Sequence, residues 1–326
     1  MIVADTVRCM ASRSSAFVVC LALVSASCGG TPAASSSSTQ APVATPGVSV
    51  TYVGADGMTT TVTDISRIVT LSGDYSEIVW DLGLGSNLVG VDLGSVYPKD
   101  EMRLKPKVGV EYRLLTEPIL TLEPTLVIGD IDASPSTVID QVRAAGVPVV
   151  IFPRFEGTTA PADKIRAVAG ILGIGDGGEQ FAASVQAEID AALATAAGAQ
   201  SHPRVAVLYI ATANTMLLLG SNTVFDGLLE AVGAVDVGPP AGADGFVALT
   251  PEALIAAAPD VIITAQRGFD GVGGLEGFLA IPGVAQTPAG QSRSVLVYED
   301  LLLLGLGPRT GQLLAALIAD LHPELG

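Results

Sequence analysis

Cysteine and histidine, the side chains that most often bind metals or act as nucleophiles, are scarce in this sequence of 326 residues. The only three cysteines are Cys9, Cys20 and Cys28, all at the extreme N-terminus. The two histidines, His202 and His322, lie far apart along the chain. A disulfide framework, a zinc site or a thiol nucleophile is therefore excluded downstream of Cys28, and a Ser-His-Asp triad or a His-based metal cluster is poorly supported.

The context of Cys28 indicates export. Two arginines precede the apolar stretch 16–24, which is too short to span a bilayer and has the polarity of a secretory signal. Residues 25–28 (SASC) resemble a bacterial lipobox, whose cysteine is lipidated and becomes the mature N-terminus, although Ser25 replaces the usual Leu. An ordinary cleaved signal with an incidental cysteine is the alternative. Residues 29–46 are almost all Gly, Ser, Thr, Ala and Pro, which is typical of a flexible tether.

The composition of the chain excludes two broad classes of protein. With 49% apolar and 15% charged residues it can bury substantial cores, so global disorder is excluded. The formal net charge is −17, from 16 Lys and Arg against 33 Asp and Glu. Nucleic-acid binding requires clustered basic residues that displace counterions, and the sequence has no such cluster. The acidity is instead typical of a protein kept soluble outside the cell.

Short apolar runs alternate with helical segments after the tether. Segments 48–53 and 59–62 flank a Gly-Ala-Asp-Gly turn and predict a β-hairpin. Segment 67–71 predicts a buried strand, followed by a helix that stops at Gly83 and by a strand at 88–91. This alternation predicts a mostly parallel sheet with helices on both faces.

The same order of elements recurs in the second half, with strands expected at 204–210 and 259–264 and a helix at 224–232. A sharper repeat links residues 117–124 (EPILTLEP) with 252–259 (EALIAAAP). Each copy opens a short helix with Glu, ends on Pro and runs directly into an apolar strand. Two copies at this wide separation indicate two similar lobes rather than a solenoid.

Between the lobes, segment 179–197 is rich in Ala and carries large apolar residues at every fourth position. This spacing predicts a single helix of about 30 Å, which would permit little hinge opening. The predicted fold class is therefore α/β, with two Rossmann-like lobes that have mostly parallel sheets and are joined by one long helix. A ligand would bind in the cleft outside the carboxyl ends of the strands. The predicted divisions are a signal peptide at 1–27, lipidated Cys28 with the tether at 28–47, the N-terminal lobe at 48–176, the interlobe helix at 177–200 and the C-terminal lobe at 201–326.

Taken in order, these motifs resemble the class III substrate-binding proteins of the iron-complex and vitamin B12 type, which serve ABC importers. The resemblance covers residue 64 to the C-terminus. It rests on the ordered series 67–72 (RIVTLS), 89–92 (VGVD) with Tyr97-Pro98, 117–124, the interlobe helix, 252–260 and 305–309 (GLGPR).

Within this superfamily the chain resembles the bacterial heme-binding subgroup. The matching features are Val108-Gly109 followed by Arg113 and Glu117, then 281–288 (IPGVAQTP) and 303–310 (LLGLGPRT). The resemblance implies a monomeric, non-enzymatic protein that binds heme as cargo rather than as a catalytic cofactor. It would deliver the heme to an ABC permease dimer with its ATPase subunits, at the outer face of the cell membrane. A ferric siderophore or cobalamin stays open as the ligand, because these features characterise the subgroup and are not signatures of ligand contact.

The resemblance also assigns ligand-binding residues. Tyr97 matches a tyrosine that is the axial ligand of heme iron in relatives, and phenolate is a hard donor suited to ferric iron. Its ring could instead line the pocket, and cobalamin-binding relatives also carry Tyr-Pro here. Arg113 and Arg267 would pair with the two propionates and favour a nearby phenolate, unless they are ordinary surface arginines. The loop at 129–132 has no His, so we expect five-coordinate iron or a small exogenous sixth ligand. Met216, beside three Leu, is more typical of core or pocket lining, and becomes the next candidate donor only if Tyr97 does not bind the iron.

In relatives, the glutamates that match Glu117 and Glu252 dock on arginines of the permease. A symmetric permease dimer presents two like-charged sockets, which requires one acid on each lobe. Such charge pairs set orientation and on-rate more than affinity. The alternative is that both glutamates are simply favoured at helix N-termini by the macrodipole.

A different class, an extracytoplasmic enzyme or scaffold on the same fold, stays open because fold alone does not define function. The scarcity of His and Cys argues against an enzyme, as does the absence of a Gly-x-Ser-x-Gly nucleophile elbow.

Overall fold

The computed structural model describes residues 49–212, 214–225 and 227–325. The predicted signal peptide, the predicted lipidation site Cys28 and the tether lie outside the described residues. The first described element is the predicted hairpin, formed by β1 (Val50–Val53) and β2 (Thr59–Val62), which pair antiparallel.

The sheet of the N-terminal lobe has four parallel strands in the order β4-β3-β7-β8. These strands are β3 (Ile68–Thr70), β4 (Leu88–Gly90), β7 (Leu126–Asp130) and β8 (Val149–Phe152). Every residue of β3 and β8 is buried. Continuous apolar strands of this kind are expected where helices cover both faces of a parallel sheet.

Short helices and one small hairpin connect these strands. The helices are α1 (Gly73–Val79) with the π-helical turn η1 (Trp80–Leu84), α2 (Lys99–Leu104), α3 (Thr116–Thr121), α4 (Ser136–Ala144) and α5 (Ala160–Ile171). The hairpin consists of β5 (Gly109–Val110) and β6 (Arg113–Leu114). Gly83 has a φ of 82°, so the helical run after β3 breaks at the predicted glycine.

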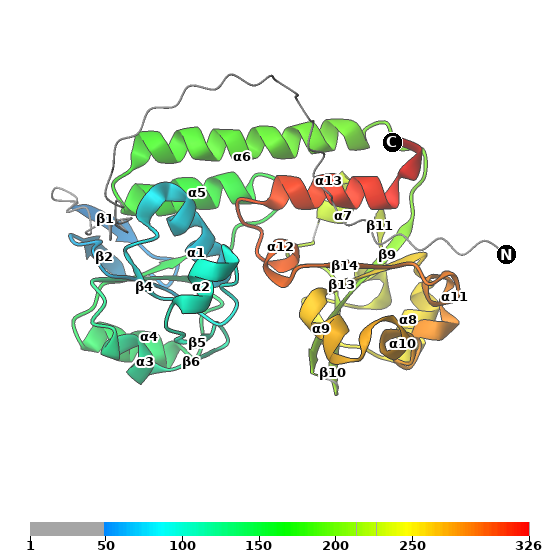
Figure 1. The fold of residues 1–326 in the computed structure, drawn as a ribbon, viewed down its shortest axis with the longest axis horizontal. Helices are drawn as coiled ribbons and strands as arrows, with labels where there is room; N and C mark the ends of the chain where they lie inside the picture. The colour runs from blue at the N-terminus through cyan, green and yellow to red at the C-terminus, as the bar shows by residue number, and fades with distance from the viewer. Residues whose placement is uncertain (1–48, 213, 226, 326) are drawn as a thin grey trace, which may run out of the picture. The chain divides into compact units, whose positions relative to one another are not determined.

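The predicted interlobe helix is α6 (Gly175–Ala196). It packs against α5 of the N-terminal lobe and against α13 (Thr310–Leu321) near the C-terminus, as Figure 1 shows. Its buried face includes Val185 and Ile189. Gly178 permits the close approach to α5, because a Cβ there would lie 2.1 Å from the Cβ of Ala169.

The second sheet has the order β12-β10-β9-β13-β14, with a short sixth strand, β11, beside β9. Its strands are β9 (Arg204–Thr212), β10 (Thr215–Leu219), β11 (Val235–Asp236), β12 (Phe246–Ala248), β13 (Val261–Ala265) and β14 (Val295–Tyr298). Strands β9, β13 and β14 are parallel, whereas β10 runs antiparallel to both of its neighbours. The fold is therefore α/β with mostly parallel sheets, as predicted.

The helices of this lobe are short. They are α7 (Leu228–Ala231), α8 (Pro251–Ala257), α9 (Gln266–Gly271), α10 (Gly274–Leu279), α11 (Pro288–Ser292) and α12 (Asp300–Leu304), with 3-10 turns η2 (Pro239–Ala241), η3 (Val284–Gln286) and η4 (Pro323–Leu325). The helix expected at 224–232 was too long. Gly227 has a left-handed φ of 77°, so α7 begins only at Leu228.

The sequence repeat corresponds to equivalent places in the two sheets. Helix α3 leads into β7, which lies between β3 and β8. Helix α8 leads into β13, which lies between β9 and β14. Glu117 and Glu252 therefore occupy the first turns of matching helices.

Candidate ligand-binding site

The loop that carries Tyr97 follows β4 and is held by buried polar contacts. The carboxylate of Asp92 accepts hydrogen bonds from Ser95 Oγ (2.5 Å) and from the backbone N–H of Gly94 (2.7 Å). Lys107 Nζ donates to the carbonyl oxygens of Ser95 (2.9 Å) and Asp92 (3.3 Å). The chain is thus fixed immediately before Tyr97, which suits a residue that must present its ring at a defined position.

A chain of hydroxyls connects this loop to the core of the lobe. Ser95 Oγ lies 2.6 Å from Ser76 Oγ, which in turn lies 2.6 Å from Thr70 Oγ1 at the end of β3. All three side chains are buried. Burial raises the pKa of Asp92 to about 6, although the hydrogen bonds from Ser95 and Gly94 act in the opposite direction.

The ring of Tyr97 is covered by the guanidinium of Arg309, whose central carbon lies 3.8 Å from the ring centroid. Arg309 also forms a bidentate pair with Glu77 of α1, with Nε–Oε1 and Nη2–Oε2 distances of 2.8 and 3.0 Å. A longer contact of 3.4 Å joins it to Glu299, after β14. Arg309 therefore connects the two lobes behind Tyr97. Tyr97 keeps 38% of its surface exposed, and its hydroxyl has no hydrogen-bond partner among the described residues.

A second cation, Lys164, also connects α1 to the C-terminal lobe. Lys164 of α5 forms a buried ion pair with Asp74 of α1 and donates to the carbonyl oxygen of Gly305 (3.2 Å). Asp74 also accepts a hydrogen bond from Ser72. Asp74 and Glu77, one turn apart on α1, are thus each paired with a cation. These cations, Lys164 and Arg309, connect α1 to the segment between α12 and α13.

In the C-terminal lobe, Tyr209 lies near the carboxyl end of β9. It is half-buried, and its ring meets that of Phe246 edge-on at 6.1 Å. Burial raises the pKa of Tyr209, whereas a hydrogen bond and positive charge from Arg267 lower it. The charge of Tyr112 in the N-terminal lobe also raises it, so on balance the pKa of Tyr209 lies above its ordinary value. This constellation draws on both lobes and was not predicted from the sequence.

Arg267 is the second residue of α9, which directly follows β13. Its Nη2 lies 3.2 Å from Oδ1 of Asp300, and its backbone N–H donates to the other carboxylate oxygen at 3.0 Å. The side chain remains 65% exposed. Asp300 thus orients an arginine that stays accessible to a ligand.

Tyr112 and Arg113 lie at the hairpin of β5 and β6. Tyr112 is 68% exposed, and Arg113 is exposed without an ion pair among the described residues. The preceding residue, Glu111, is half-buried, and its backbone carbonyl accepts a hydrogen bond from the backbone N–H of Ser134 (2.8 Å). Burial, followed by the negative charge of Asp130, raises the pKa of Glu111. The hairpin is anchored on one side and presents an aromatic ring and a free guanidinium on the other.

The three predicted ligand residues thus fall into separate groups. Tyr97 lies with Arg309, Arg267 with Tyr209, and Arg113 beside Tyr112. No described hydrogen bond or ion pair joins Tyr97 to Arg113 or Arg267. A signal for Tyr209 was present in the sequence, because it lies near the carboxyl end of an aliphatic strand, where such sheets place ligands.

The two predicted docking residues are exposed. Within the described part of the chain, neither Glu117 nor Glu252 forms a side-chain ion pair or hydrogen bond. Each has a large exposed apolar neighbour, Leu115 (53%) near Glu117 and Ile255 (42%) near Glu252. Both carboxylates are therefore available to a partner.

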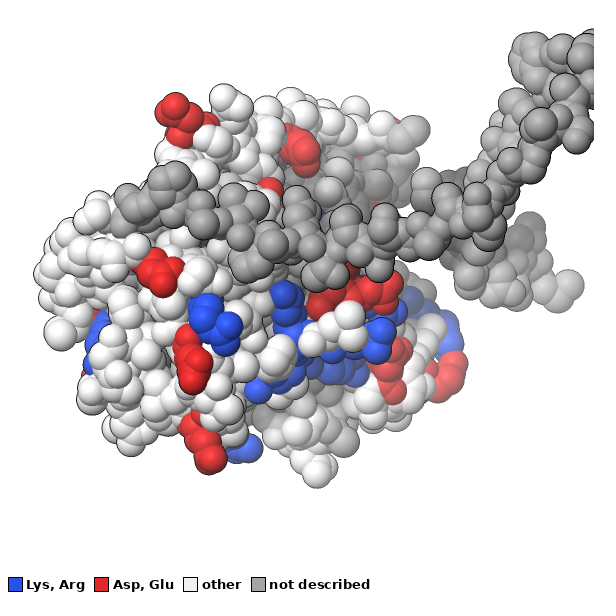
Figure 2. All heavy atoms as spheres, turned by 60° about the vertical axis from the view of Figure 1, so that its left-hand side comes forward, with Lys and Arg blue, Asp and Glu red and all other residues white. Residues whose placement is uncertain are grey.

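Positive charge is unevenly distributed over the sequence. Figure 2 shows Lys and Arg gathered on part of the face in view, with Asp and Glu beside them. In the C-terminal lobe the basic residues are only Arg204, Arg267, Arg293 and Arg309. Most cations that could meet an anionic ligand therefore come from the N-terminal lobe.

The family model described as "Periplasmic binding protein" matches residues 68–301. The chain belongs to this family, as a class III substrate-binding protein of ABC importers. Family members and structural neighbours of this kind are binding proteins rather than enzymes. Among the described helices, none combines the length and apolar character needed to cross a bilayer.

Solved structures with high similarity are heme-binding proteins. The apo form of the periplasmic heme-binding protein RhuT from Roseiflexus sp. RS-1 is 43% identical, with a TM-score of 0.77, over 81% of this chain and 100% of that chain. The heme-binding protein HmuT is 32% identical, with a TM-score of 0.80, over 87% and 93% of the two chains. BhuT in complex with two hemes is 34% identical, with a TM-score of 0.72, over 80% and 99%.

Curated sequences match over shorter stretches. The uncharacterized ABC transporter substrate-binding lipoprotein YvrC of Bacillus subtilis (strain 168) is 23% identical over 61% of this chain. A vitamin B12-binding protein of Yersinia pestis (strain Pestoides F) is 32% identical over 26% of this chain. The chain spans 63% and 29% of the lengths of these two relatives.

Proposed function

We propose that this protein captures heme between its two lobes outside the cytoplasm and delivers it to an ABC importer. The observation that carries the ligand is the exposed ring of Tyr97, which follows a fixed loop and has the guanidinium of Arg309 3.8 Å from its centroid. Phenolate is the form of tyrosine that binds ferric iron. The similarity to heme-binding structures supports the same ligand.

Tyr97 is our proposed iron ligand from the N-terminal lobe. Its hydroxyl is free, and the loop before it is fixed by Asp92 and Lys107. The guanidinium of Arg309 over its ring would stabilise negative charge on the bound phenolate. Tyr209 is the second candidate, because it is half-buried near the carboxyl end of β9, against which α9 with Arg267 packs.

Arg113 is the proposed propionate partner on the hairpin of β5 and β6. It is exposed and unpaired within the described residues, so binding a carboxylate would break no existing ion pair. Arg267 is shared between Asp300 and Tyr209, so a propionate would compete with the aspartate for it. We therefore expect Arg113 to contribute more to propionate binding than Arg267 does.

Glu117 and Glu252 are the proposed contacts to the permease, one from each lobe. Their matching positions at the starts of α3 and α8 suit a partner with two like-charged sockets. Lipidation of Cys28 would hold the protein at the outer face of the membrane, close to that permease. The name of the lipoprotein relative YvrC supports such an anchor.

The experiment that tests this function is a titration of the purified protein with hemin, followed by its absorbance spectrum. A saturable change in the near-ultraviolet heme band, with no comparable binding of cobalamin or a ferric siderophore, is expected. Binding of cobalamin or a siderophore instead would retain the transport role and overturn the ligand. Binding of none of the three would overturn the proposal.

A further inference from the structure

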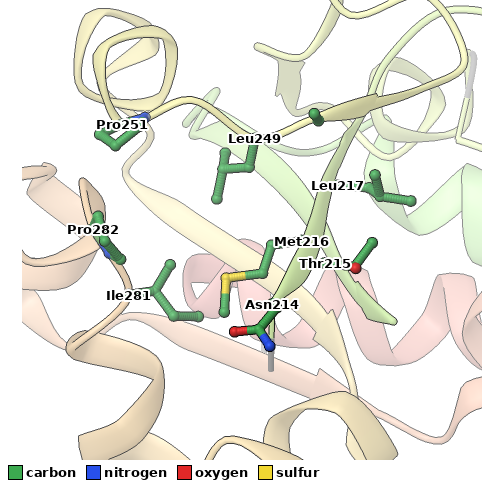
Figure 3. Close-up of a pocket in the computed structure, with 9 residues that line it drawn as sticks. Asn214, Thr215, Met216, Leu217, Leu249, Pro251, Ile281 and Pro282 are labelled. Carbon is green, nitrogen blue, oxygen red and sulfur yellow. The ribbon is translucent and has the colours of Figure 1, made fainter. Parts of the chain in front are cut away.

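The C-terminal lobe has a pocket of about 350 Å³ between the β10–β12 edge, the start of α8 and the segment before η3. Met216, Leu249 and Ile281 form its apolar wall, and Pro251 lies at its rim. In Figure 3 the side chains of Met216, Leu249 and Ile281 point toward one another across this space. None of the lining residues is charged, so the pocket offers no counter-charge to an anionic ligand.

The rim of the pocket carries one of the proposed docking acids. Pro251 lines the pocket, and Glu252 is the next residue, exposed and unpaired within the described chain. Ile255, one turn later on the same face of α8, is 42% exposed. The acid is therefore flanked by an apolar cavity on one side and an exposed apolar side chain on the other.

This combination fits a protein partner with a basic residue next to an apolar one. About a dozen waters occupy a volume of this size in the liquid, and the apolar walls offer them few hydrogen-bond partners. An apolar side chain that enters the pocket would displace some of this water. The negative charge of Glu252 would repel propionates, which argues against a second heme at this place. Apolar anchors that enter pockets, surrounded by polar contacts, are typical of protein interfaces.

We infer that this pocket receives an apolar side chain of the permease, next to the basic residue that pairs with Glu252. The inference rests on the proposed transport function and adds a second, apolar contact to it. It also assigns Met216 to the partner interface rather than to the heme iron.

The test places the photo-crosslinker p-benzoylphenylalanine at Leu249 of the full-length protein in cells, with Leu193 on α6 as the matched control position. Mass spectrometry of the product from Leu249 is expected to identify a permease subunit of an ABC importer, and Leu193 is expected to give none. This readout does not depend on which ligand is carried. A product from the same crosslinker at Ile255, one turn after Glu252, but not at Leu249 would overturn the pocket and retain docking through α8.

Two substitutions measure the contribution of the pocket. Leu249→Trp fills the space, and Met216→Gln makes its wall polar at nearly the same volume. Both should bind hemin within about twofold of wild type while heme-dependent growth falls about tenfold, as for the loss of one interface anchor. Leu193→Trp is the matched control and should support normal growth. Normal growth with both pocket variants, or a crosslink to a second copy of this chain, would overturn the inference.

Discussion

The guanidinium of Arg309 lies flat against Tyr97, 3.8 Å from its ring centroid, while it binds the carboxylate of Glu77 with two hydrogen bonds. Glu77 is almost fully buried, and burial raises its pKa, whereas the hydrogen bond and charge of Arg309 lower it. Arg309, from the C-terminal lobe, thus neutralises a buried acid of the N-terminal lobe, contacts Glu299 of its own lobe and forms a wall behind the proposed iron ligand.

Replacement of Arg309 by Met should destabilise the protein by about 3 kcal/mol, because the buried Glu77 would lose its partner. The double variant Glu77→Gln/Arg309→Met should recover part of this loss, since no buried charge remains. Urea unfolding of the wild type, both single variants and the double variant measures the coupling. Additive effects in this cycle would contradict a direct interaction.

Replacement of Tyr97 by Phe should remove the tyrosinate charge-transfer feature of the ferric heme complex and retain the apolar wall. We expect the affinity for hemin to fall about tenfold or more, since a bond to a charged group is lost while ring contacts persist. Hemin titration with absorbance detection measures both effects.

Tyr209→Phe and Arg113→Ala are the controls for this measurement. Arg113→Ala should weaken binding without changing the axial-ligand feature, because it acts on a propionate. If the feature is retained in Tyr97→Phe and lost in Tyr209→Phe, Tyr209 is the iron ligand. If it survives both tyrosine substitutions, neither residue binds the iron.

The buried carboxyl of Asp92 should make stability depend on pH. Its pKa is raised from 3.8 to about 6 in the folded protein, so the native state binds this proton more tightly than the unfolded chain does. Its stabilising contribution is complete below about pH 4 and is lost as the pH rises to about 6, a change of about 2–3 kcal/mol.

Asp92→Asn cannot titrate and should abolish this part of the pH dependence. Chemical unfolding of the wild type and the variant at pH 4 and pH 7 compares the two. An identical change in unfolding free energy for both proteins would show that Asp92 is not the responsible group.

Glu117→Ala and Glu252→Ala should reduce heme uptake in cells and leave hemin affinity nearly intact. The double variant should be more impaired, because each acid serves a separate socket of the permease. Growth on hemin as the iron source, together with hemin titration of each purified variant, provides the measurement. Loss of ligand binding in either single variant would instead assign that glutamate to the heme site.

Cys28→Ser should release the protein from the membrane fraction, because the variant lacks the thiol that carries the lipid. Fractionation of cells followed by immunoblotting of the membrane and soluble fractions tests this. Unchanged membrane retention would contradict the lipobox interpretation of residues 25–28.

Local patterns in the sequence determined the class of fold and the places of its main elements. Apolar runs predicted the strands β3, β7, β9 and β13, and the four-residue spacing from Phe181 to Leu193 predicted α6. The repeated Glu-to-Pro segments indicated two equivalent helix–strand units. These features depend on residues close together in the chain, so periodicity and turn residues were sufficient to find them.

The partners of the site residues were decided only by the tertiary structure. Arg309 reaches Tyr97 and Glu77 from the other end of the chain, and Tyr209 meets Arg267 because β9 and β13 are neighbouring parallel strands. The sequence assigned Arg113 and Arg267 to the cleft without Tyr209 or Tyr112. Contacts between distant segments follow from strand order and lobe packing, which the spacing of residues within one segment does not encode.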